Sequence, residues 1–294
     1  MKSPYICIDS KKIVMKRILL LSAALLFLGS AGFSQKIKIR SEKPEDHVLS
    51  IMSFNIRHGK GMDGKVDFAR IAKEISLVQP DVVALQEVDK GTERVGGADS
   101  PKTIARLAGD YAGYFASAMD YDGGKYGNAI LTKKPPVHST YYALPGSEEP
   151  RVVLILEFED FYFGSVHMSL DKDSRIDACR KLAQIAKKCI NKDKLFFLAG
   201  DFNLEPNSME MRILAESFSV LSAFEVKTFP SDNPDRTLDY IMVYRGGAGK
   251  SFLKKLEKGQ IGVASWVQPE KEASDHRPVF SLIYKGENIV TEKF

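Results

Sequence analysis

Polar side chains that could bind a metal ion or move a proton stand at the ends of short apolar runs in this sequence. Six such positions occur: Asn55, Gln86-Glu87, His167, Asp201 with Asn203, Asp239, and Asp275-His276. A single Asp or His at a strand end is more often a turn or capping residue than a functional group. Six of them favour a shared site, because polar groups at the ends of adjacent strands of an α/β sheet converge on one rim, where ligands bind.

These residue types suit the metal-assisted hydrolysis of an ester. Carboxylate and carboxamide oxygens are hard ligands for Mg²⁺, Mn²⁺ or Ca²⁺, and the sequence has no Cys/His cluster with the spacing of a zinc site. Two histidines beside carboxylates supply groups that transfer protons near neutral pH. The sequence also lacks a glycine-rich phosphate loop and the Gly-x-Ser-x-Gly motif of serine hydrolases. We therefore expect a hydrolase that uses Mg²⁺, or Mn²⁺ or Ca²⁺ in its place.

Short strands and a few helices must position these residues. Alternating or continuous apolar runs predict strands over residues 48–56, 82–85, 129–131, 152–158, 161–166, 195–198, 238–243, 261–267 and 279–283. Helices are predicted over residues 68–78, 100–108 and 209–215. The run from Ser174 to Asp177 resembles a capping box that opens a further helix. No repeat or shift in composition marks a boundary, so we expect one domain over residues 48–285, with a polar lead (35–47) before it and a tail (286–294) after it.

The first 34 residues have the pattern of an export signal. A lysine-arginine pair precedes an apolar stretch over residues 18–28, and small residues follow it. The stretch is shorter than the roughly 20 apolar residues that span a membrane. We expect a signal peptide over residues 1–34 that starts at Met1 or Met15 and is cleaved before Gln35. The mature protein would be periplasmic or extracellular, without a stable membrane span, and the alternative is an uncleaved amphipathic anchor.

The formal net charge of +4 lies mostly in that signal peptide. Five of the 42 basic residues and one of the 38 acidic residues fall in the first 34 positions, so the rest of the chain is electrically balanced. Proteins that bind a long polyanion accumulate Lys and Arg, because each neutralised phosphate releases counterions. The balance favours a small or lipid-linked phosphoester as substrate over a long nucleic acid.

Seven short motifs occur in order along the chain: Ser-Phe-Asn-Ile (53–56), Gln-Glu-Val (86–88), Tyr-Gly-Asn-Ala-Ile-Leu (126–131), Val-His-Met (166–168), Gly-Asp-Phe-Asn (200–203), Leu-Asp-Tyr-Ile (238–241) and Ser-Asp-His-Arg-Pro-Val (274–279). Together they resemble the endonuclease/exonuclease/phosphatase superfamily, which has the pancreatic-deoxyribonuclease-like fold. The resemblance covers residues 48–285 and is specific to the superfamily but not to a substrate. It implies an α/β (α+β) four-layer sandwich, in which two mixed β-sheets pack face to face with helices on the outside.

The resemblance also implies a metal site. Glu87, with Asn55 nearby, would hold the divalent cation, and Asp275 would help to hold it. Asp275 would in addition orient His276, which would act as a general base or as a phosphate ligand.

Further catalytic roles follow from the same resemblance. Asp201 would activate or orient the attacking water, and Asn203 would stabilise the pentacovalent phosphorus. His167 would hydrogen-bond a phosphate oxygen or assist the leaving group. Asp239 would orient a histidine, as the carboxylate of a catalytic triad does. Whether His167 or His276 is the base stays open.

Four more residues are candidates for substrate binding. Arg151 is placed like the family's phosphate-facing arginine, and Tyr126 and Asn128 belong to the motif that lines the same rim. Arg94 is the fourth candidate. The planar fork of an arginine can donate two hydrogen bonds to a phosphate, whereas the alternative for each of these residues is an ordinary surface or loop position.

Two other functions stay open at this point. One is an extracellular endonuclease or exonuclease that acts on DNA or RNA. The other is a binding module that kept the fold and lost catalysis. Such a loss would normally leave a gap among the motif residues, and the motifs here are complete. The sequence does not indicate an oligomeric state.

Overall fold

The structure, a computed structural model, describes residues 47–189 and 193–286. The predicted signal peptide with its cleavage point, nearly all of the polar lead and nearly all of the tail lie outside the described residues. Within the described part of the chain, no helix is long and apolar enough to cross a membrane.

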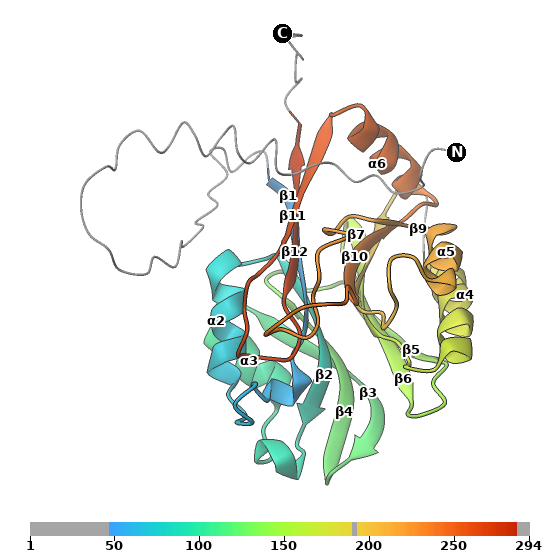
Figure 1. The fold of residues 1–294 in the computed structure, drawn as a ribbon. Coiled ribbons are helices and arrows are strands. Elements are labelled where there is room, and N and C mark those ends of the chain that lie inside the picture. Colours follow the sequence, from blue (N-terminus) through green and yellow to red (C-terminus); the bar gives the residue numbers. More distant parts are fainter. Residues whose placement is uncertain (1–46, 190–192, 287–294) are drawn as a thin grey trace, which may run out of the picture.

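Two mixed sheets of six strands pack face to face (Figure 1). The strand order in the first is β11 (Ile261–Val267), β12 (Val279–Lys285), β1 (His47–Asn55), β2 (Val82–Lys90), β4 (Gly124–Thr132) and β3 (Ala112–Tyr121). The order in the second is β5 (His138–Leu144), β6 (Arg151–Glu157), β7 (Phe161–His167), β8 (Leu195–Asp201), β10 (Asp239–Tyr244) and β9 (Phe218–Val220). Each sheet contains one parallel pair, β1 with β2 and β7 with β8.

Helices cover the outer faces of both sheets, which confirms the predicted four-layer sandwich (Figure 1). The first sheet is covered by α2 (Phe68–Val78) and α3 (Ser100–Ala108), and the second by α4 (Lys172–Cys189) and α5 (Met209–Ala215). A further helix, α6 (Ala248–Glu257), packs its apolar side onto the core between the sheets. Two short 3-10 helices, η3 (Arg57–Gly59) and η4 (Glu93–Val95), follow β1 and β2.

Side-chain alternation divides the core into three layers. Along β8, Phe196 and Leu198 pack beneath α4, whereas Phe197 and Ala199 face the space between the sheets. Because successive side chains of a strand point to opposite faces, Asp201 has the same direction as Phe197 and Ala199. The alternation that builds the inner core therefore also turns this carboxylate into the space between the sheets.

The prediction of a capping box at Ser174 is wrong. The helix α4 begins at Lys172, and the Asp171 carboxylate accepts a hydrogen bond from the Ser174 N–H at 2.8 Å. Asp171 therefore caps this helix, since a carboxylate before the first turn satisfies N–H groups that have no partner within the helix. The predicted bounds of α3 and α5 agree with the structure.

Three strands and one α-helix of the fold were not predicted: β3, β5, β9 and α6. The strands β3, β5 and β9 lie at sheet edges, and β3 and β5 leave many residues exposed or half-buried. Edge strands of this kind lack the continuous apolar runs by which buried strands are recognised in a sequence.

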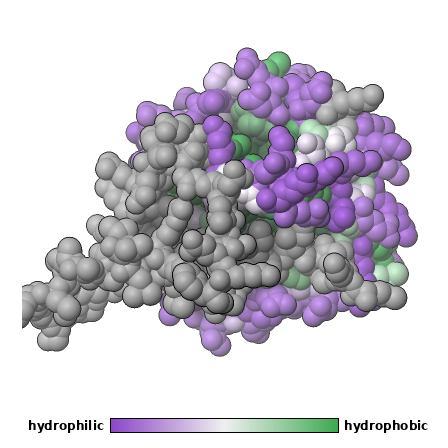
Figure 2. All heavy atoms as spheres, turned by 90° about the horizontal axis from the view of Figure 1, so that it is seen from above, coloured by the Kyte–Doolittle hydropathy of each residue, from purple (hydrophilic) through white to green (hydrophobic). Residues whose placement is uncertain are grey.

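Hydrophilic residues make up most of the described surface visible in Figure 2, with apolar side chains between them.

Candidate active site

Strand direction brings the predicted residues to one rim of the sandwich. The parallel pairs β1–β2 and β7–β8 both end there, and the antiparallel strands β10 and β12 begin there. Each pair comes from a different sheet, so the rim joins residues that are far apart in sequence. It collects Asn55, Glu87, His167, Asp201, Asp239 and His276.

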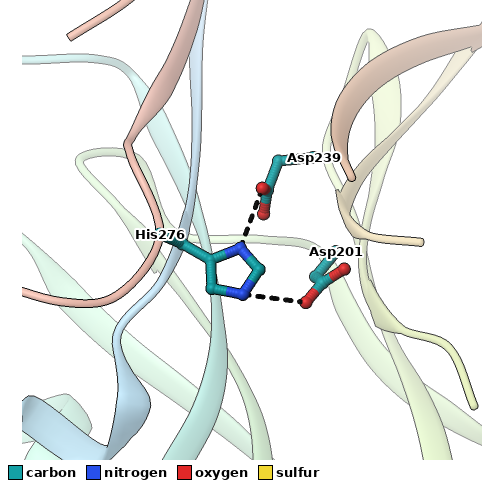
Figure 3. Close-up of side chains that lie close together, drawn as sticks. All are labelled: Asp201, Asp239 and His276. Atoms are coloured by element: carbon teal, nitrogen blue, oxygen red, sulfur yellow. Dashed lines mark hydrogen bonds and ion pairs between the residues drawn. The ribbon is translucent and has the colours of Figure 1, made fainter. Parts of the chain in front are cut away.

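At the centre of this rim, the His276 ring lies between two carboxylates (Figure 3). Its Nδ1 is 2.9 Å from Asp239 Oδ2, and its Nε2 is 3.6 Å from Asp201 Oδ2. The Phe229 ring packs on the imidazole at 4.7 Å between centroids. All three polar side chains are buried. Asp239 therefore fixes the orientation of His276, the role that the sequence suggested for a carboxylate at this position.

The two histidines of the site have opposite electrostatic surroundings. Burial disfavours the charge of His276, but the carboxylates of Asp239 and Asp201 outweigh it and raise the pKa of His276 to about 10. Burial and the nearby charges of Arg151 and His276 hold the pKa of His167 well below its usual value. Burial also raises the pKa of Asp201 to about 7. At neutral pH, His276 is thus the charged imidazole of the site and His167 the neutral one.

Glu87 reaches the rim because β2 is irregular at this residue. The pairing of β2 with β4 shifts between Leu85 and Val88, and Glu87 has a left-handed backbone with φ of 54°. Leu85 and Val88 both pack in the outer core beneath α2 and α3, so the bulge absorbs one extra residue. A β-bulge re-aims side chains in this way, and here it lets Glu87 accept a hydrogen bond from Asn55 Nδ2 at 2.9 Å.

Glu87 has the properties of a ligand for a hard divalent cation. Burial and the nearby charge of Asp275 raise the pKa of Glu87, against the hydrogen bond from Asn55 and the charge of His276, and a bound cation would further favour its ionised form. Asn55 Nδ2 donates both to Glu87 and to Asp201 (3.1 Å), while its Oδ1 accepts the Arg57 N–H at 3.1 Å. The carboxamide of Asn55 therefore ties the carboxylate of one sheet to that of the other.

A second group of residues could also hold a metal ion. Asp201, Asp239 and His276 offer ligand atoms that all lie within 4.8 Å of one another. An imidazole must be neutral to bind a metal, and the two carboxylates favour the protonated form of His276. Of the two groups, Glu87 fits a cation better.

The prediction that Asp275 orients His276 is wrong. The hydrogen bond to His276 Nδ1 comes from Asp239 and not from Asp275. Asp275 Oδ2 instead lies 3.4 Å from Arg57 Nε, and its Oδ1 accepts from Ser274 Oγ at 3.3 Å. The adjacent side chains of a loop need not face the same way, so neighbourhood in sequence did not identify the partner of the histidine.

Asn203 and Arg151 flank the central residues. Asn203 has a left-handed backbone with φ of 50°, its N–H donates to Asp201 Oδ1 at 2.9 Å, and its Nδ2 donates to the Met168 carbonyl at 2.9 Å. Arg151 is buried and is paired with Glu148 and Glu149, but within the described part of the chain its Nε has no partner. An arginine N–H without a partner in such a place is a donor that a phosphate oxygen can use.

Among the described residues, the other candidates for substrate binding have no hydrogen bond to His276. Asn128 is buried, and its Nδ2 donates to the Val152 carbonyl at 2.8 Å, so it joins the two sheets. Tyr126 lines a small cavity that also contacts Asn128, Arg151 and His167. Arg94 is held by Asp89 and does not reach His276 or Asp201 by any hydrogen bond among the described residues.

Two residues near the metal candidate were missed in the sequence. Arg57 and His58 follow Asn55 in η3, and both have left-handed backbones, with φ of 45° and 47°. Both line a cavity together with Glu87. The signal that could have identified them is their position, since these two basic residues come just after the predicted site residue Asn55, separated from it only by Ile56.

Comparisons with known proteins agree with this fold. The profile of the Endonuclease/Exonuclease/phosphatase family matches residues 52–276. No curated protein sequence matches the chain. Among solved structures, an endonuclease/exonuclease/phosphatase from Beutenbergia cavernae is 20% identical and has a TM-score of 0.59, with 83% of this chain and 73% of that chain covered.

Two further solved structures are similar in fold. A mannosyl-6-phosphatase from Bacteroides thetaiotaomicron is 17% identical, with a TM-score of 0.62 and with 80% of this chain and 99% of that chain covered. The catalytic domain of human Nocturnin, solved with a bound sulfate anion, is 20% identical, with a TM-score of 0.56 and with 81% and 94% covered. At these identities the similarity shows the fold.

Proposed function

Because the chain belongs to the endonuclease/exonuclease/phosphatase family, we propose that it is an exported, divalent-metal-dependent phosphoesterase that breaks a P–O bond with an activated water. The observation that carries the proposal is the buried chain of Asp201, His276 and Asp239, which adjoins Asn55 and Glu87 on the same rim. This arrangement brings together a proton acceptor (Asp201), a protonated imidazole (His276) and a metal ligand (Glu87).

In this proposal, Asp201 accepts the proton of the attacking water. Its pKa, raised by burial to about 7, suits a base that works near neutral pH. His276, which Asp239 holds in its protonated form, stabilises the negative charge that develops on the phosphate. Asp239 is a positioning residue, because it acts through His276.

The phosphate itself is held by residues of the second sheet. Arg151 donates from its unpartnered Nε, and His167, neutral and 3.5 Å from Asp201 through Nε2, donates to an oxygen of the phosphate or of the leaving group. The position of Asn203 is fixed by its bonds to Asp201 and Met168, so its side chain contacts the phosphorus centre with little loss of freedom.

A divalent cation fits at Glu87, with Asn55 and Asp275 close by. When bound there, it would polarise the phosphoryl oxygens and lower the charge of the transition state. Mg²⁺ is the expected ion, with Mn²⁺ or Ca²⁺ as alternatives, because the donors are oxygens. Without a cation, Asn55 keeps Glu87 close to Asp201 through its two hydrogen bonds.

The substrate that we propose is a small or lipid-linked phosphoester. The electrical balance of the chain after residue 34 supports it, since long nucleic acids select for a surplus of basic residues. The mannosyl-6-phosphatase of the same fold adds to this support. Cleavage of DNA or RNA is the second candidate, because members of this fold family include nucleases by name.

The test is a set of substrates incubated with purified protein that begins at Gln35. It contains p-nitrophenyl phosphate, bis-p-nitrophenyl phosphate, sphingomyelin, phosphoinositides and plasmid DNA, each with Mg²⁺ and with excess chelator. We expect hydrolysis of at least one ester that stops in chelator and in the Asp201→Asn variant. Asp177→Asn, an exposed aspartate on α4, is the matched control. Full turnover in chelator, or no turnover of any ester, would refute the proposal.

Export is tested separately. We expect the protein secreted by its native host to begin at Gln35, because the lysine-arginine pair, the apolar stretch and the small residues before Gln35 form a cleavable signal. N-terminal sequencing of the exported protein that finds Met1 or Met15 would contradict this part of the proposal.

A further inference from the structure

A cavity of about 170 Å³ has Glu87 in its wall and shares Tyr126 with the smaller cavity that His167 and Arg151 line. We name it the tyrosine pocket. Its volume is similar to that of an engineered cavity of about 150 Å³ that holds one benzene molecule, so it has room for a single six-membered ring. Residues of its wall are Arg57, His58, Arg94, Tyr121, Tyr126 and Glu149.

The wall of the tyrosine pocket is held in place by its own contacts. The Arg94 N–H donates to Asp122 Oδ2 at 2.7 Å, and the Glu93 N–H donates to the Asp122 carbonyl at 2.8 Å, so η4 is docked on the turn between β3 and β4. The Arg94 guanidinium stacks over the rings of Tyr121 (4.3 Å) and Tyr126 (5.6 Å). The pocket therefore exists before a ligand arrives, which lowers the entropic cost of binding.

The charges of the tyrosine pocket are balanced. Apart from Glu87, every charged side chain of its wall has an opposite charge beside it. The pairs are Arg57 with Asp275 (Nε to Oδ2, 3.4 Å), Arg94 with Asp89 (Nε to Oδ2, 2.6 Å) and Glu149 with Arg151 (Oε1 to Nη1, 2.9 Å). A second phosphate would find no surplus of positive charge here. An uncharged ligand with several hydrogen-bonding groups would lose little by leaving water.

Arg94 and Tyr121 provide complementary contacts for such a ligand. Arg94 donates to Asp89 from Nε and Nη2, and its Nη1 has no acceptor within the described part of the chain. Tyr121 is 40% exposed, so a ligand can reach it. An aromatic face for C–H groups, beside a fixed donor and a carboxylate, suits a ring that carries hydroxyl groups.

Backbone strain points to the same place. Arg57 and His58 are consecutive residues with left-handed backbones, followed by Gly59 with φ of 83°. Side chains with a Cβ adopt this conformation at a cost, and such residues cluster at ligand-binding and active sites. The strain turns Arg57 toward Asp275 and places His58 in the wall of the pocket.

We propose that the tyrosine pocket binds the organic group esterified to the scissile phosphate, and that this group is an uncharged polyhydroxylated ring, such as a hexose or a cyclitol. Tyr121 packs on the ring, and Arg94 and Glu149 bind its hydroxyl groups. The inference rests on the proposed phosphoesterase function, because it takes the phosphate to lie beside Glu87. It names the substrate class that the rim alone leaves undefined.

The kinetic test compares esters that share a phosphate and differ in the attached group. The substrates are glucose 6-phosphate, mannose 6-phosphate, myo-inositol 1-phosphate, methyl phosphate and fructose 1,6-bisphosphate. We expect kcat/KM for the best ring monoester to exceed that for methyl phosphate by about tenfold or more, since a stacked ring and two hydroxyl contacts contribute at least that much. The bisphosphate should not be preferred over the best ring monoester.

Variants of Tyr121 show whether the pocket causes that preference. Tyr121→Ala should lower the ratio of kcat/KM values, ring ester over methyl phosphate, by about five- to tenfold, the range for a lost aromatic contact. Tyr121→Phe keeps the ring and should keep most of the ratio. Tyr141→Ala changes another exposed tyrosine, on β5 of the other sheet, and is the matched control. An unchanged ratio in Tyr121→Ala, or a clear preference for the bisphosphate, would overturn the inference.

A binding measurement separates this inference from the proposed function. Saturation-transfer difference NMR with the same ring monoesters needs no turnover, and it can be recorded on the Asp201→Asn variant of the full mature chain. We expect saturation of the ring C–H protons, which the added Tyr121→Ala change should abolish. Ring signals without hydrolysis would remove the proposed reaction and keep the pocket assignment. Hydrolysis without ring signals for any of these esters would do the reverse.

Discussion

At the rim, the space between the two sheets holds Asp201, Asp239 and His276, whereas at the opposite end it is filled by Phe197 and the apolar side of α6. Phe197 meets the α6 ring of Phe252 edge to face, at 6.1 Å between centroids. Asp201 and Phe197 lie on the same strand and on the same side of it, about 13 Å apart at the usual rise of a strand. One layer of the molecule thus changes from apolar packing to buried charge within four residues.

Between these two ends lies a set of neutral polar side chains that joins the sheets. Gln86 Nε2 is 3.3 Å from Ser165 Oγ, which donates to the Leu85 carbonyl at 3.2 Å, and Ser53 Oγ donates to Gln86 at 3.4 Å. Buried polar groups are tolerated when they are hydrogen-bonded. The comparison indicates a division of roles, in which the apolar end stabilises the fold and the rim holds charges that reduce stability but are suited to catalysis.

The largest expected effect comes from the rim. Asp201→Asn should lower kcat/KM by about 10²–10⁴-fold, the contribution of a positioned acid or base. Combined with His276→Ala, the loss should be far smaller than the product of the two single losses, because the residues act as a unit. The measurement is steady-state kinetics on the best ester, and multiplying losses would contradict the shared role.

The same variant tests the stability side of the comparison. Asp201→Asn loses a carboxylate that accepts from Asn55 and Asn203, but it also removes a buried negative charge. We expect its unfolding midpoint to stay near that of the parent in circular dichroism. Inactivity that is accompanied by loss of the folded signal would make the kinetic result uninformative about catalysis and would remove the division of roles.

Substitution at the apolar end should lower stability and leave catalysis unchanged. Phe197→Ala should lower the free energy of unfolding by about 3–5 kcal/mol, the usual loss for a fully buried phenylalanine. The kcat of the molecules that remain folded should be unchanged, since the rings that Phe197 contacts are those of Phe161 and Phe252 and not the imidazole of His276. Denaturant unfolding and activity at the same temperature measure both quantities. Phe197→Leu leaves a smaller cavity and should lose less stability.

The positions of the rim residues could be predicted from the sequence because strands are marked by local apolar runs, and the rim residues stand at the ends of these runs. Asn55, His167 and Asp201 each end a run of alternating or buried apolar residues, and such runs define strands. The predicted bounds of α3 and α5 agree with the structure as well, where Asp99 and Ser208 cap the two helices.

What the sequence did not predict depends on contacts across the fold. The partner of His276 is Asp239, 37 positions away, and not its neighbour Asp275. The bulge at Glu87 and the left-handed backbones of Arg57 and His58 arise where β2 and β1 meet the rim, and no apolar period records them. Local patterns thus located the residues of the site, whereas the pairing between them required the structure.

A smaller effect is expected when the rim loses its metal ligand. Glu87→Gln should weaken Mg²⁺ or Mn²⁺ binding by at least about 10–100-fold, the loss found even when a residue that only supports a ligand is changed. Isothermal titration with each metal measures this directly. Glu257→Gln, at the exposed end of α6 at the apolar side of the sandwich, is the control and should bind metal like the parent. Equal binding by Glu87→Gln would move the metal to the group of Asp201, Asp239 and His276.

A buried carboxyl group that belongs neither to the rim nor to the apolar end provides the last test. Glu74 on α2 is 5% exposed, and burial together with the charge of Glu270 raises its pKa to about 7. Glu270 in turn accepts the backbone N–H groups of Glu272 (2.7 Å) and Ala273 (2.9 Å), just before Ser274. Glu74 is thus a perturbed acid that touches no reacting group, so it should affect stability and not catalysis.

The sign of its effect follows from the raised pKa. A carboxyl group whose pKa is higher in the folded state stabilises the fold while it is protonated. This contribution is lost as the pH rises from the pKa of the group in the unfolded state through its pKa of about 7 in the folded state. Glu74→Gln cannot lose a proton, so it should unfold at a higher temperature than the parent at about pH 8.5 and show a much smaller difference at about pH 5. Thermal unfolding at the two pH values measures this, and kcat should not change. A difference that is equal at both pH values would show that the fold does not favour the protonated form of Glu74. A fall in kcat would instead place Glu74 and Glu270 within the catalytic network, and Glu74→Gln could then not serve as a control for the rim variants.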